Sequence, residues 1–425
     1  MMRFGIKNMT KRMMKYAACY LIMIFVFVVL LTLVYMIPNE KIEYHREYSI
    51  YTLSAIEETW ESFGNMFGLH SQPGMMDNTT DRIMMTEALI SDESMSALEA
   101  AVYMNGYTRY WHGYQVFLRP LLVVYQLHQI RYLNMFVFFG VFCLVLFALK
   151  KRTGMLSAIA FFLTMVCAYI VVIPMSMQYM PVFMVTMLAM LLILLRYPFC
   201  KRENLPLLFM IIGMTINFLD LLTTPIVTLC MPLLMCLYLE EKNGLKGLEA
   251  VKIALGCSVA WSMGYSLCWL AKWVLSSIVL KKNIFGEVTG KVQTWAIERD
   301  HSESRVGSVI RNFNDYFTFH GIRTMVFPLL FLALLMVCIL LFRYKEKSRW
   351  ACSGVMLAIS LYTYIWYAVL MEHSWLHHWF TFRAQSVTHF GVYLAMIGMI
   401  DQNKICVIAE ALQKKGRCPN ISKSE

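Results

Sequence analysis

The chain has 425 residues, of which 59% are hydrophobic and only 15% are charged, and this balance lies outside the usual range of soluble globular proteins. The composition therefore excludes an ordinary soluble enzyme and predicts a membrane protein. The net charge of +11 does not indicate a nucleic-acid partner, because the Lys and Arg residues gather in alternate short loops, the positive-inside pattern of multi-pass membrane proteins.

Apolar stretches of about 20 residues, enough to cross a bilayer as a helix, recur along the chain. They predict an all-α polytopic membrane protein with about ten transmembrane helices in a single domain, residues 1–425. The first stretch is too long for a signal peptide and should remain as an anchor. The predicted spans are 16–37, 132–149, 155–174, 178–195, 205–220, 225–239, 253–278, 322–342, 350–371 and 384–400.

Basic residues before Tyr16, at 150–152, 196–202 and 343–349 and in the tail 401–425 predict cytoplasmic N- and C-termini and a plasma-membrane location. The longest external segments are then loop 38–131 and loop 281–321. The first contains apolar residues at helical spacing over residues 80–104, which predicts amphipathic surface helices. Neither loop contains a cysteine, so no disulfide framework is expected.

The stretch "GMMDNTTDR" in the first loop places Asp77 and Asp81 four residues apart. If this stretch is helical, the two carboxylates share a face and could serve in acid–base chemistry. The competing interpretation is an N-cap at Asn78 with Asp81 in the first helical turn. Both interpretations remain open at this stage.

The stretch "YTRYWHGYQVFLRP" and the start of the second span carry basic residues on the external side, against the positive-inside trend. An aromatic and arginine belt at the membrane interface explains part of this pattern. Arginine also matches phosphate oxygens with two-point geometry, which favours an anion site. The basic residues here are Arg109, His112, Arg119 and Arg131.

Asp220 in "NFLDLLTTP" lies at the outer end of the fifth span, where an acid is costly unless paired. We expect it to pair with an arginine, and keep a role as a secondary acid as the alternative. Spans five and six are short, and they could form a hairpin that does not fully cross.

The stretch "MEHSWLHHWFTFRA" supplies His373, His377, His378 and Arg383 before the last span. His373 and His377 should share a helical face, but a metalloprotease-type zinc site needs Glu directly after the first His, where Ser374 stands. An aromatic belt is a second interpretation, and binding of a phosphate or polar headgroup is the one we favour. A divalent metal is possible but not indicated, and no cofactor is required.

Phosphate-cradling and nucleophile-elbow glycine motifs are absent from the sequence, which argues against an ATP-driven pump and a serine hydrolase. Acids in a long external loop, with arginines and histidines near the lipid, suit glycosyl transfer from a lipid-phosphate sugar. A carboxylate would serve as general base, and fixed cations would stabilise the leaving phosphate.

The long acidic first external loop with surface helices and the ten spans resemble the GT-C superfamily of integral-membrane glycosyltransferases. The stretches "DNTTDR", "RYWHGYQVFLRPLL", "NFLDLLTTP" and "HSWLHHWFTFRA" are also similar to those of bacterial membrane proteins grouped near that superfamily. The resemblance implies a polyprenyl-phosphate-linked sugar as donor. It also implies an acceptor outside the cytoplasm, which could be an envelope polymer, a lipid or a protein.

The chain departs from the superfamily in the position of its acid. GT-C enzymes commonly carry the catalytic acid soon after the first span, where this chain has Glu40 and Glu43 and no aspartate. We expect Asp81, then Asp77, as the catalytic base, with Asp220 and Glu43 as secondary acids. The expected donor-phosphate ligands are Arg109, His112, Arg119, Arg131, His373, His377, His378 and Arg383.

A transporter or flippase of a lipid-linked or anionic envelope precursor would use the same external cations. Such proteins usually carry polar groups at the membrane midplane and inverted repeats. The predicted spans are mostly free of charge, apart from Lys272 and Asp220, and contain no visible repeat. The sequence therefore favours surface chemistry over passage, with a non-catalytic membrane scaffold as a third alternative.

Overall fold

The computed structural model describes residues 2–66, 77–195, 201–296, 304–317, 321–344, 346–402 and 404. Within these residues every regular element is a helix, and the only extended pairing is an isolated bridge between Arg343 and Ile400. The predicted all-α class is confirmed for this part of the chain.

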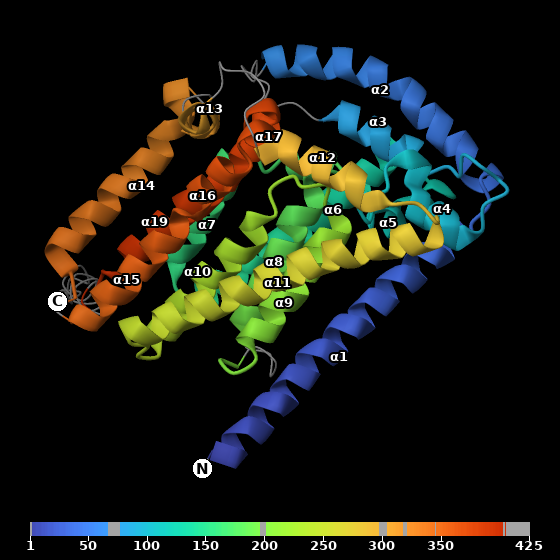
Figure 1. Ribbon diagram of the computed structural model, residues 1–425. Coiled ribbons are helices and arrows are strands. Elements are labelled where there is room, and N and C mark those ends of the chain that lie inside the picture. Colours follow the sequence, from blue (N-terminus) through green and yellow to red (C-terminus); the bar gives the residue numbers. More distant parts are fainter. Residues whose placement is uncertain are drawn as a thin grey trace, which may run out of the picture.

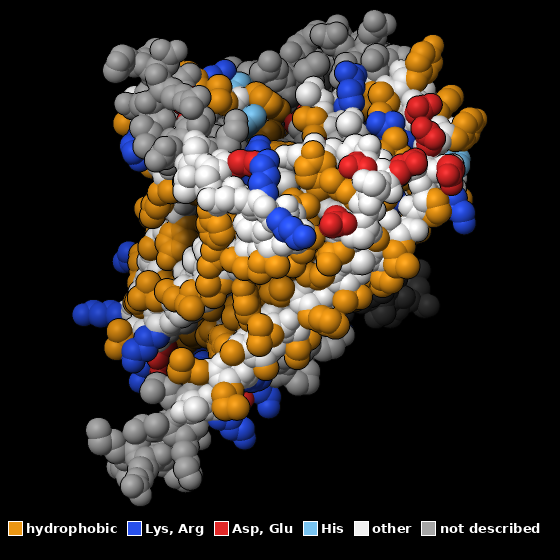
Figure 2. Space-filling view, turned by 45° about the vertical axis from the view of Figure 1, so that its right-hand side comes forward, with side chains coloured by type: hydrophobic (Ala, Val, Ile, Leu, Met, Phe, Trp, Pro, Cys, Tyr) orange, Lys and Arg blue, Asp and Glu red, His pale blue; other side chains and the backbone are white. Residues whose placement is uncertain are grey.

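Five helical segments of the described chain are long and apolar enough to cross a membrane. They lie in α1 (Met2–Tyr35), α6 (Leu127–Arg152), α11 (Gly247–Val279), α14 (Gly321–Phe342) and the pair α15 (Lys347–Ser360) and α16 (Tyr362–Val369). Hydrophobic side chains cover the middle of the face seen in Figure 2, with charged side chains above and below them. An apolar band between two polar ends is the surface expected of a protein whose solvent is a bilayer.

Shorter apolar helices fill the interior of the bundle. They are α7 (Met155–Cys167), α8 (Met180–Leu195), α9 (Leu205–Leu219), α10 (Ile226–Lys242) and α19 (Gln385–Gly398). Almost every residue of α10 and α19 is buried, so these two helices form the core around which the others pack. Each apolar segment predicted from the sequence contains a helix. Of the described helical segments, the five named above are confirmed as long and apolar enough to cross a membrane.

The helices run between two ends of the molecule (Figure 1). At one end the side chain of Arg12 donates to the Glu203 carbonyl at 3.1 Å, and Arg349 pairs with Glu241 at 3.0 Å. At the same end the Asp401 N–H donates to the Phe342 carbonyl at 2.8 Å. These contacts join the start of α1, the loop before α9, the end of α10, the start of α15 and the ends of α14 and α19. We call this the inner end, and the opposite one the outer end.

The outer end is built from shorter helices that belong to the two long loops. The first loop forms α2 (Glu40–Met66), α3 (Asn78–Thr86), α4 (Ala97–Tyr103), the 3-10 helix η2 (Met104–Gly106) and α5 (Gln115–Leu122). The loop between α11 and α14 forms α12 (Ile284–Ala296) and α13 (Arg305–Phe317), and the segment before α19 forms α17 (Met371–Leu376), α18 (His378–Thr381) and η5 (Phe382–Ala384). The 3-10 helix η3 (Ile173–Met175) lies between α7 and α8.

The helices predicted within residues 80–104 are present as α3 and α4. A capping box starts α4, because the Ser96 hydroxyl accepts the Glu99 N–H while the Glu99 carboxylate accepts the Ser96 N–H at 2.8 Å. The helix α2 was not predicted, and α6 begins at Leu127 rather than at 132, so that Arg131 lies inside α6.

Glycines allow α9 and α11 to approach closely. A Cβ atom on Gly213 would overlap the Trp261 carbonyl, and one on Gly264 would overlap the Met210 carbonyl. Small residues at helix crossings are the usual means of tight packing in membranes, where no hydrophobic effect drives the helices together. This crossing holds α11 against the core, and the outer end of α11 then supports the aromatic residues of the first loop.

Candidate functional site

Asp77 forms the N-cap of α3, the role that the sequence had suggested for Asn78. Its Oδ1 atom accepts the Thr80 N–H at 2.9 Å and its Oδ2 atom accepts the Thr80 hydroxyl at 2.7 Å. The indole N–H of Trp379 points to the same Oδ2 atom at 3.5 Å. The carboxylate of the first loop therefore lies against the histidine-rich segment before α19, about three hundred residues later in the chain.

Asp81 is held in a closed arrangement. It is fully buried, its Oδ2 atom lies 2.7 Å from Nη2 of Arg131, and its Oδ1 atom accepts the Met177 N–H at 3.1 Å. The same Arg131 nitrogen donates to Asn78 Oδ1 at 2.7 Å. Burial raises the pKa of Asp81 to about 6, although the Arg131 charge acts in the opposite direction. Both oxygens are occupied, so the geometry gives Asp81 a structural role between α3, α6 and the turn that follows η3.

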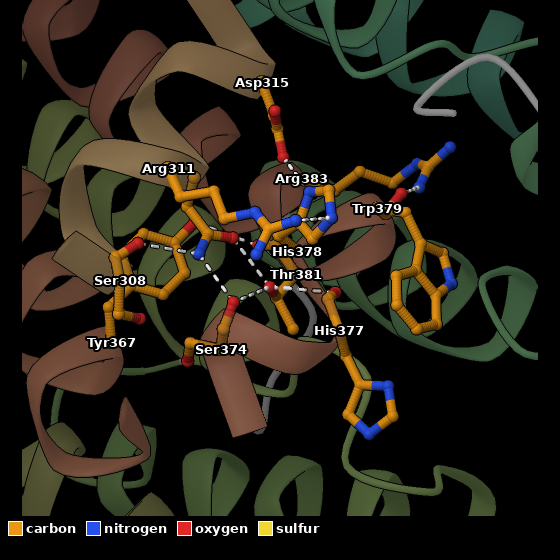
Figure 3. Close-up of polar contacts among 11 residues, drawn as sticks. Ser308, Arg311, Asp315, Tyr367, Ser374, His377, His378, Trp379, Thr381 and Arg383 are labelled. Atoms are coloured by element: carbon orange, nitrogen blue, oxygen red, sulfur yellow. Dashed lines mark hydrogen bonds and ion pairs between the residues drawn. The ribbon is translucent and has the colours of Figure 1, made fainter. Parts of the chain in front are cut away.

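The three histidines of the segment before α19 differ in their contacts. His373 Nε2 lies 2.8 Å from the Leu222 carbonyl, and burial lowers the pKa of this histidine to about 3. His377 is half-buried beside the charge of Asp77, which raises its pKa, but burial is the larger effect and lowers it. His378 Nδ1 lies 2.5 Å from Asp315 Oδ2. Figure 3 shows the His377 ring pointing away from His378 and its partners Arg311 and Asp315.

Arg383 is fully buried and ties helices together. Its Nε atom donates to the Ala168 carbonyl at 3.2 Å, and its Nη1 atom donates to the Trp379 carbonyl at 3.1 Å. The guanidinium lies 4.1 Å from the centre of the Tyr179 ring. Burial lowers the pKa of Arg383, while the Asp77 charge raises it. Arg383 thus supports the segment that carries Trp379 and His377.

Arg119 is also fully buried, and backbone carbonyls surround it. It donates to the carbonyls of Val34 at 2.9 Å, of Ile37 at 2.5 Å and of Ala88. The first two carbonyls belong to the end of α1, where the last turn of a helix has no internal partners. Arg119 therefore closes the end of α1, and its three hydrogen bonds go to backbone carbonyls and not to Asp77.

Arg109 and His112 form a separate group beside α11. The Arg109 guanidinium lies over the Tyr107 ring at 4.1 Å, and the Arg109 carbonyl accepts the indole N–H of Trp269 at 2.7 Å. His112 has a positive φ of 55° and lies between the Tyr107 carbonyl at 2.9 Å and the Tyr114 hydroxyl at 2.8 Å. Burial lowers the pKa of His112 to about 3, so the ring is neutral.

The expected secondary acids, Asp220 and Glu43, make no direct contact with Asp77 or Trp379 in the described part of the chain. Asp220 Oδ2 accepts the Thr223 N–H at 2.8 Å, and no ion pair with an arginine involves Asp220 in the described residues. The expected pairing is replaced by a turn in which the backbone supplies the donor. Glu43 is exposed on α2, near Arg46.

Sequence reasoning missed the polar face of α13. Arg311 and Asp315 both contact His378 (Figure 3). Asn312 of the same helix donates to the Ser374 carbonyl at 2.8 Å. The available signal was the spacing of Ser308, Arg311, Asn312 and Asp315, which places four polar side chains on one helical face in the loop 281–321.

Several buried polar atoms near these residues have no hydrogen-bond partner among the described atoms. Buried polar atoms in proteins are normally paired with protein or with ordered water, so their concentration marks a place for bound water or a polar ligand. Within the described part of the chain, no three His, Cys, Asp or Glu side chains lie close enough to hold a metal ion. Unpartnered atoms at the outer end include those of Ser176, Gln178, Asn217, Asp220, Thr224, Ser374 and His377 and two guanidinium nitrogens of Arg131.

Comparison with known proteins gives no family for this chain: no family model, no curated protein and no solved structure matches it. The function of the chain is therefore inferred from the geometry of the outer end.

Proposed function

We propose that the chain is a multi-pass membrane glycosyltransferase, similar in plan to the GT-C superfamily, that moves a sugar from a polyprenyl-phosphate donor to an acceptor outside the cytoplasm. The observation that supports this most directly is the contact between Asp77 and Trp379. It brings a carboxylate, an aromatic ring and the half-buried His377 together at the end of the molecule where the spanning helices meet the loops.

Asp77 is the base that the geometry favours, in the reverse of the order expected from the sequence. Asp77 keeps 8% of its surface exposed and accepts hydrogen bonds only from the uncharged donors of Thr80 and Trp379, whereas Asp81 is fully buried and paired with the Arg131 charge. In the proposed step, Asp77 takes the proton of an acceptor hydroxyl, whose oxygen attacks the anomeric carbon of the sugar. The bond from that carbon to the phosphate oxygen breaks, and polyprenyl phosphate leaves with the bonding electrons.

The surrounding residues would serve to position this step. Trp379 offers an aromatic face beside the carboxylate, and His377 offers a ring nitrogen for the sugar or the phosphate. Arg383 would act by holding Trp379 in place, because it donates to the Trp379 carbonyl, and Arg131 would act by holding Asp81 through its Nη2 atom. No cofactor is required by this reaction, since the phosphate leaving group is already activated.

The proposal includes the topology expected from the sequence. All of the apolar helices would cross or enter the plasma membrane, with both termini in the cytoplasm and Asp77 outside. Basic residues at the inner end, such as Arg12, Arg202 and Arg349, support this orientation. The acceptor would be an envelope polymer, a glycolipid or a protein.

A transfer assay with the purified protein in lipid nanodiscs tests the proposal. Short-chain polyprenyl-phosphate sugars would be offered with envelope acceptors, and release of polyprenyl phosphate would be measured for the wild type and for Asp77→Asn. Asn is as good an N-cap as Asp, so this change keeps α3 capped while it removes the base. We expect at least a hundredfold lower rate for Asp77→Asn and a normal rate for Asp92→Asn, an exposed acid in the same loop.

Two results would count against the proposal. Full activity of Asp77→Asn would remove the assigned base. A wild-type protein that binds the donor saturably and cleaves none of those offered would instead favour the transporter class, because carriage of a lipid-linked precursor breaks no glycosidic bond.

A further inference from the structure

The helix α13 buries its polar face and exposes its apolar face, the reverse of a surface helix in water. Its polar side chains Ser308, Asn312 and Asp315 are buried, with at most 3% of their surface exposed. Its apolar side chains Val306, Ile310 and Phe313 are 65%, 52% and 42% exposed. These exposed residues are spaced at i, i+4 and i+7 and therefore form one stripe along the helix.

The position of α13 explains where this stripe faces. The helix ends at Phe317, and α14, which is long and apolar enough to span a membrane, begins at Gly321. An apolar stripe on a short helix beside a spanning helix suits the boundary between lipid headgroups and acyl chains. The buried face of α13 packs on α16, α17 and α18, so the polar cluster lies directly behind a helix whose exposed face is apolar.

The hydrogen bonds of this cluster fix the state of His378. Arginine can only donate, so the 2.8 Å contact from Arg311 Nη2 makes His378 Nε2 the acceptor. The proton must then be on Nδ1, which donates to Asp315 Oδ2 at 2.5 Å. His378 is therefore neutral, and Asp315 orients it, while Arg311 occupies the nitrogen that would otherwise be free.

Arg311 has a charge without a carboxylate partner among the described residues. Asp315, the acid on the same helical face, is bonded to His378 instead, and the other contact of Arg311 is the Trp375 ring, 4.6 Å from its guanidinium carbon. The side chain is half-buried, so it remains within reach of a ligand. A guanidinium on an aromatic ring, with donors to spare, is suited to two-point binding of a phosphate.

We propose that Arg311, held in position by His378 and Asp315, binds the phosphate headgroup of a membrane lipid that arrives past the apolar stripe of α13. On binding, Arg311 turns from His378 Nε2 to the phosphate oxygens. This inference deepens the proposed function, on which it rests for the identity of the lipid. The lipid source is favoured over free phosphate because the site opens behind a stripe that faces the acyl chains.

The test measures binding to the full-length protein in nanodiscs of phosphatidylcholine. The probes are farnesyl phosphate, farnesol and inorganic phosphate. We expect saturable binding of farnesyl phosphate that falls at least tenfold in Arg311→Gln and less in Arg311→Lys, because lysine keeps the charge and loses the fork. Arg305→Gln is the matched control, since Arg305 is an exposed cation of the same helix that donates to the Ala368 carbonyl at 2.8 Å, and it should bind like the wild type.

Unchanged binding in a folded Arg311→Gln protein would overturn the site. Equal affinity for inorganic phosphate and farnesyl phosphate would overturn the lipid source. A second variant, Val306→Ser with Phe313→Ser, changes the exposed stripe and leaves the buried cluster intact. This variant should bind farnesyl phosphate more weakly than the wild type, with any binding of inorganic phosphate unchanged. Equal binding of farnesyl phosphate to this variant and the wild type would contradict the role of the stripe.

The two proposals fail separately. Binding that depends on Arg311 without sugar transfer would contradict only the proposed function. Transfer that depends on Asp77, with farnesyl phosphate binding unaffected by Arg311→Gln, would contradict only the site on α13. Asp77→Asn should lose transfer and keep farnesyl phosphate binding if both hold.

Discussion

Three of the arginines expected to bind phosphate have structural partners instead. Arg119 donates to carbonyls, Arg131 pairs with Asp81, and Arg383 donates to carbonyls and lies on Tyr179. A buried carbonyl or carboxylate without a donor is costly, and one guanidinium can satisfy several of them at once. Arginine near a membrane edge thus has a structural use that competes with ligand binding.

The first residue-scale prediction concerns the buried pair of Asp81 and Arg131. Asp81→Asn should lower the free energy of unfolding by about 3–5 kcal/mol, because it leaves the Arg131 charge buried without its partner. Thermal unfolding in detergent gives the measurement, and Asp81→Asn with Arg131→Gln should recover part of the loss. An Asp81→Asn protein of normal stability and no transfer activity would show instead that Asp81 takes part in the chemistry.

Burial of His373 should make the stability of the protein depend on pH. Burial lowers the pKa of His373 from 6.5 to about 3, so the unfolded chain binds the proton first as the pH falls, and stability is lost below about pH 6.5. The loss from this residue between pH 7 and pH 5 is about 2 kcal/mol. His373→Gln, which can still donate to the Leu222 carbonyl, should remove that part of the pH dependence.

The measurement is the difference between variant and wild type across this pH range. The raised pKa of Asp81 acts with the opposite sign, since its folded form keeps the proton at a higher pH than the unfolded chain does. The subtraction cancels that contribution. Parallel pH curves for the wild type and His373→Gln would contradict a neutral, buried His373.

At the scale of elements, the crossing of α9 and α11 gives a test of packing. Gly213→Ala or Gly264→Ala would place a methyl group against a backbone carbonyl that cannot move easily, and should cost about 1–3 kcal/mol. Gly256→Ala, also on α11, is the control, because its new methyl group would meet only Pro206 at 3.9 Å. Equal melting temperatures for all three variants would mean that the helices do not cross this closely.

The elements also differ in how well the sequence predicted them. The apolar helices were located from hydropathy because membrane insertion depends on the composition of each segment alone. The helix α2 was missed because it is polar on average, although Ile42 and Leu53 are fully buried. The orientation of α13 was missed because a polar face normally points to water, and only the partners on α17 and α18 reverse it.

The same limit applies to the candidate site. Asp77 and the stretch 371–384 were singled out because acids, histidines and arginines are unusual at a membrane edge. Their contact, and the separation of Arg109 and His112 from them, depend on residues hundreds of positions apart. Residue types could be predicted from the sequence, whereas the choice between a ligand and a structural partner required the fold.

At the scale of the whole molecule, the orientation in the membrane is open to direct test. Glu93→Cys lies at the outer end and Lys151→Cys at the inner end, and both positions are exposed. A membrane-impermeant maleimide should label Glu93→Cys on intact cells, and should label Lys151→Cys only after permeabilisation, with the wild type as the background for native cysteines. The reverse pattern would place the proposed catalytic face in the cytoplasm.

The position of Arg119 has a consequence for biosynthesis. The carbonyl of Ile37, at the end of α1, receives its donor from a residue 82 positions later in the chain. A growing chain therefore inserts α1 as an anchor before the group that completes its outer end has been translated. Insertion of α1 and closure of the outer end are therefore separate events in time, and in the proposed orientation the first loop must cross the membrane before the closure can occur.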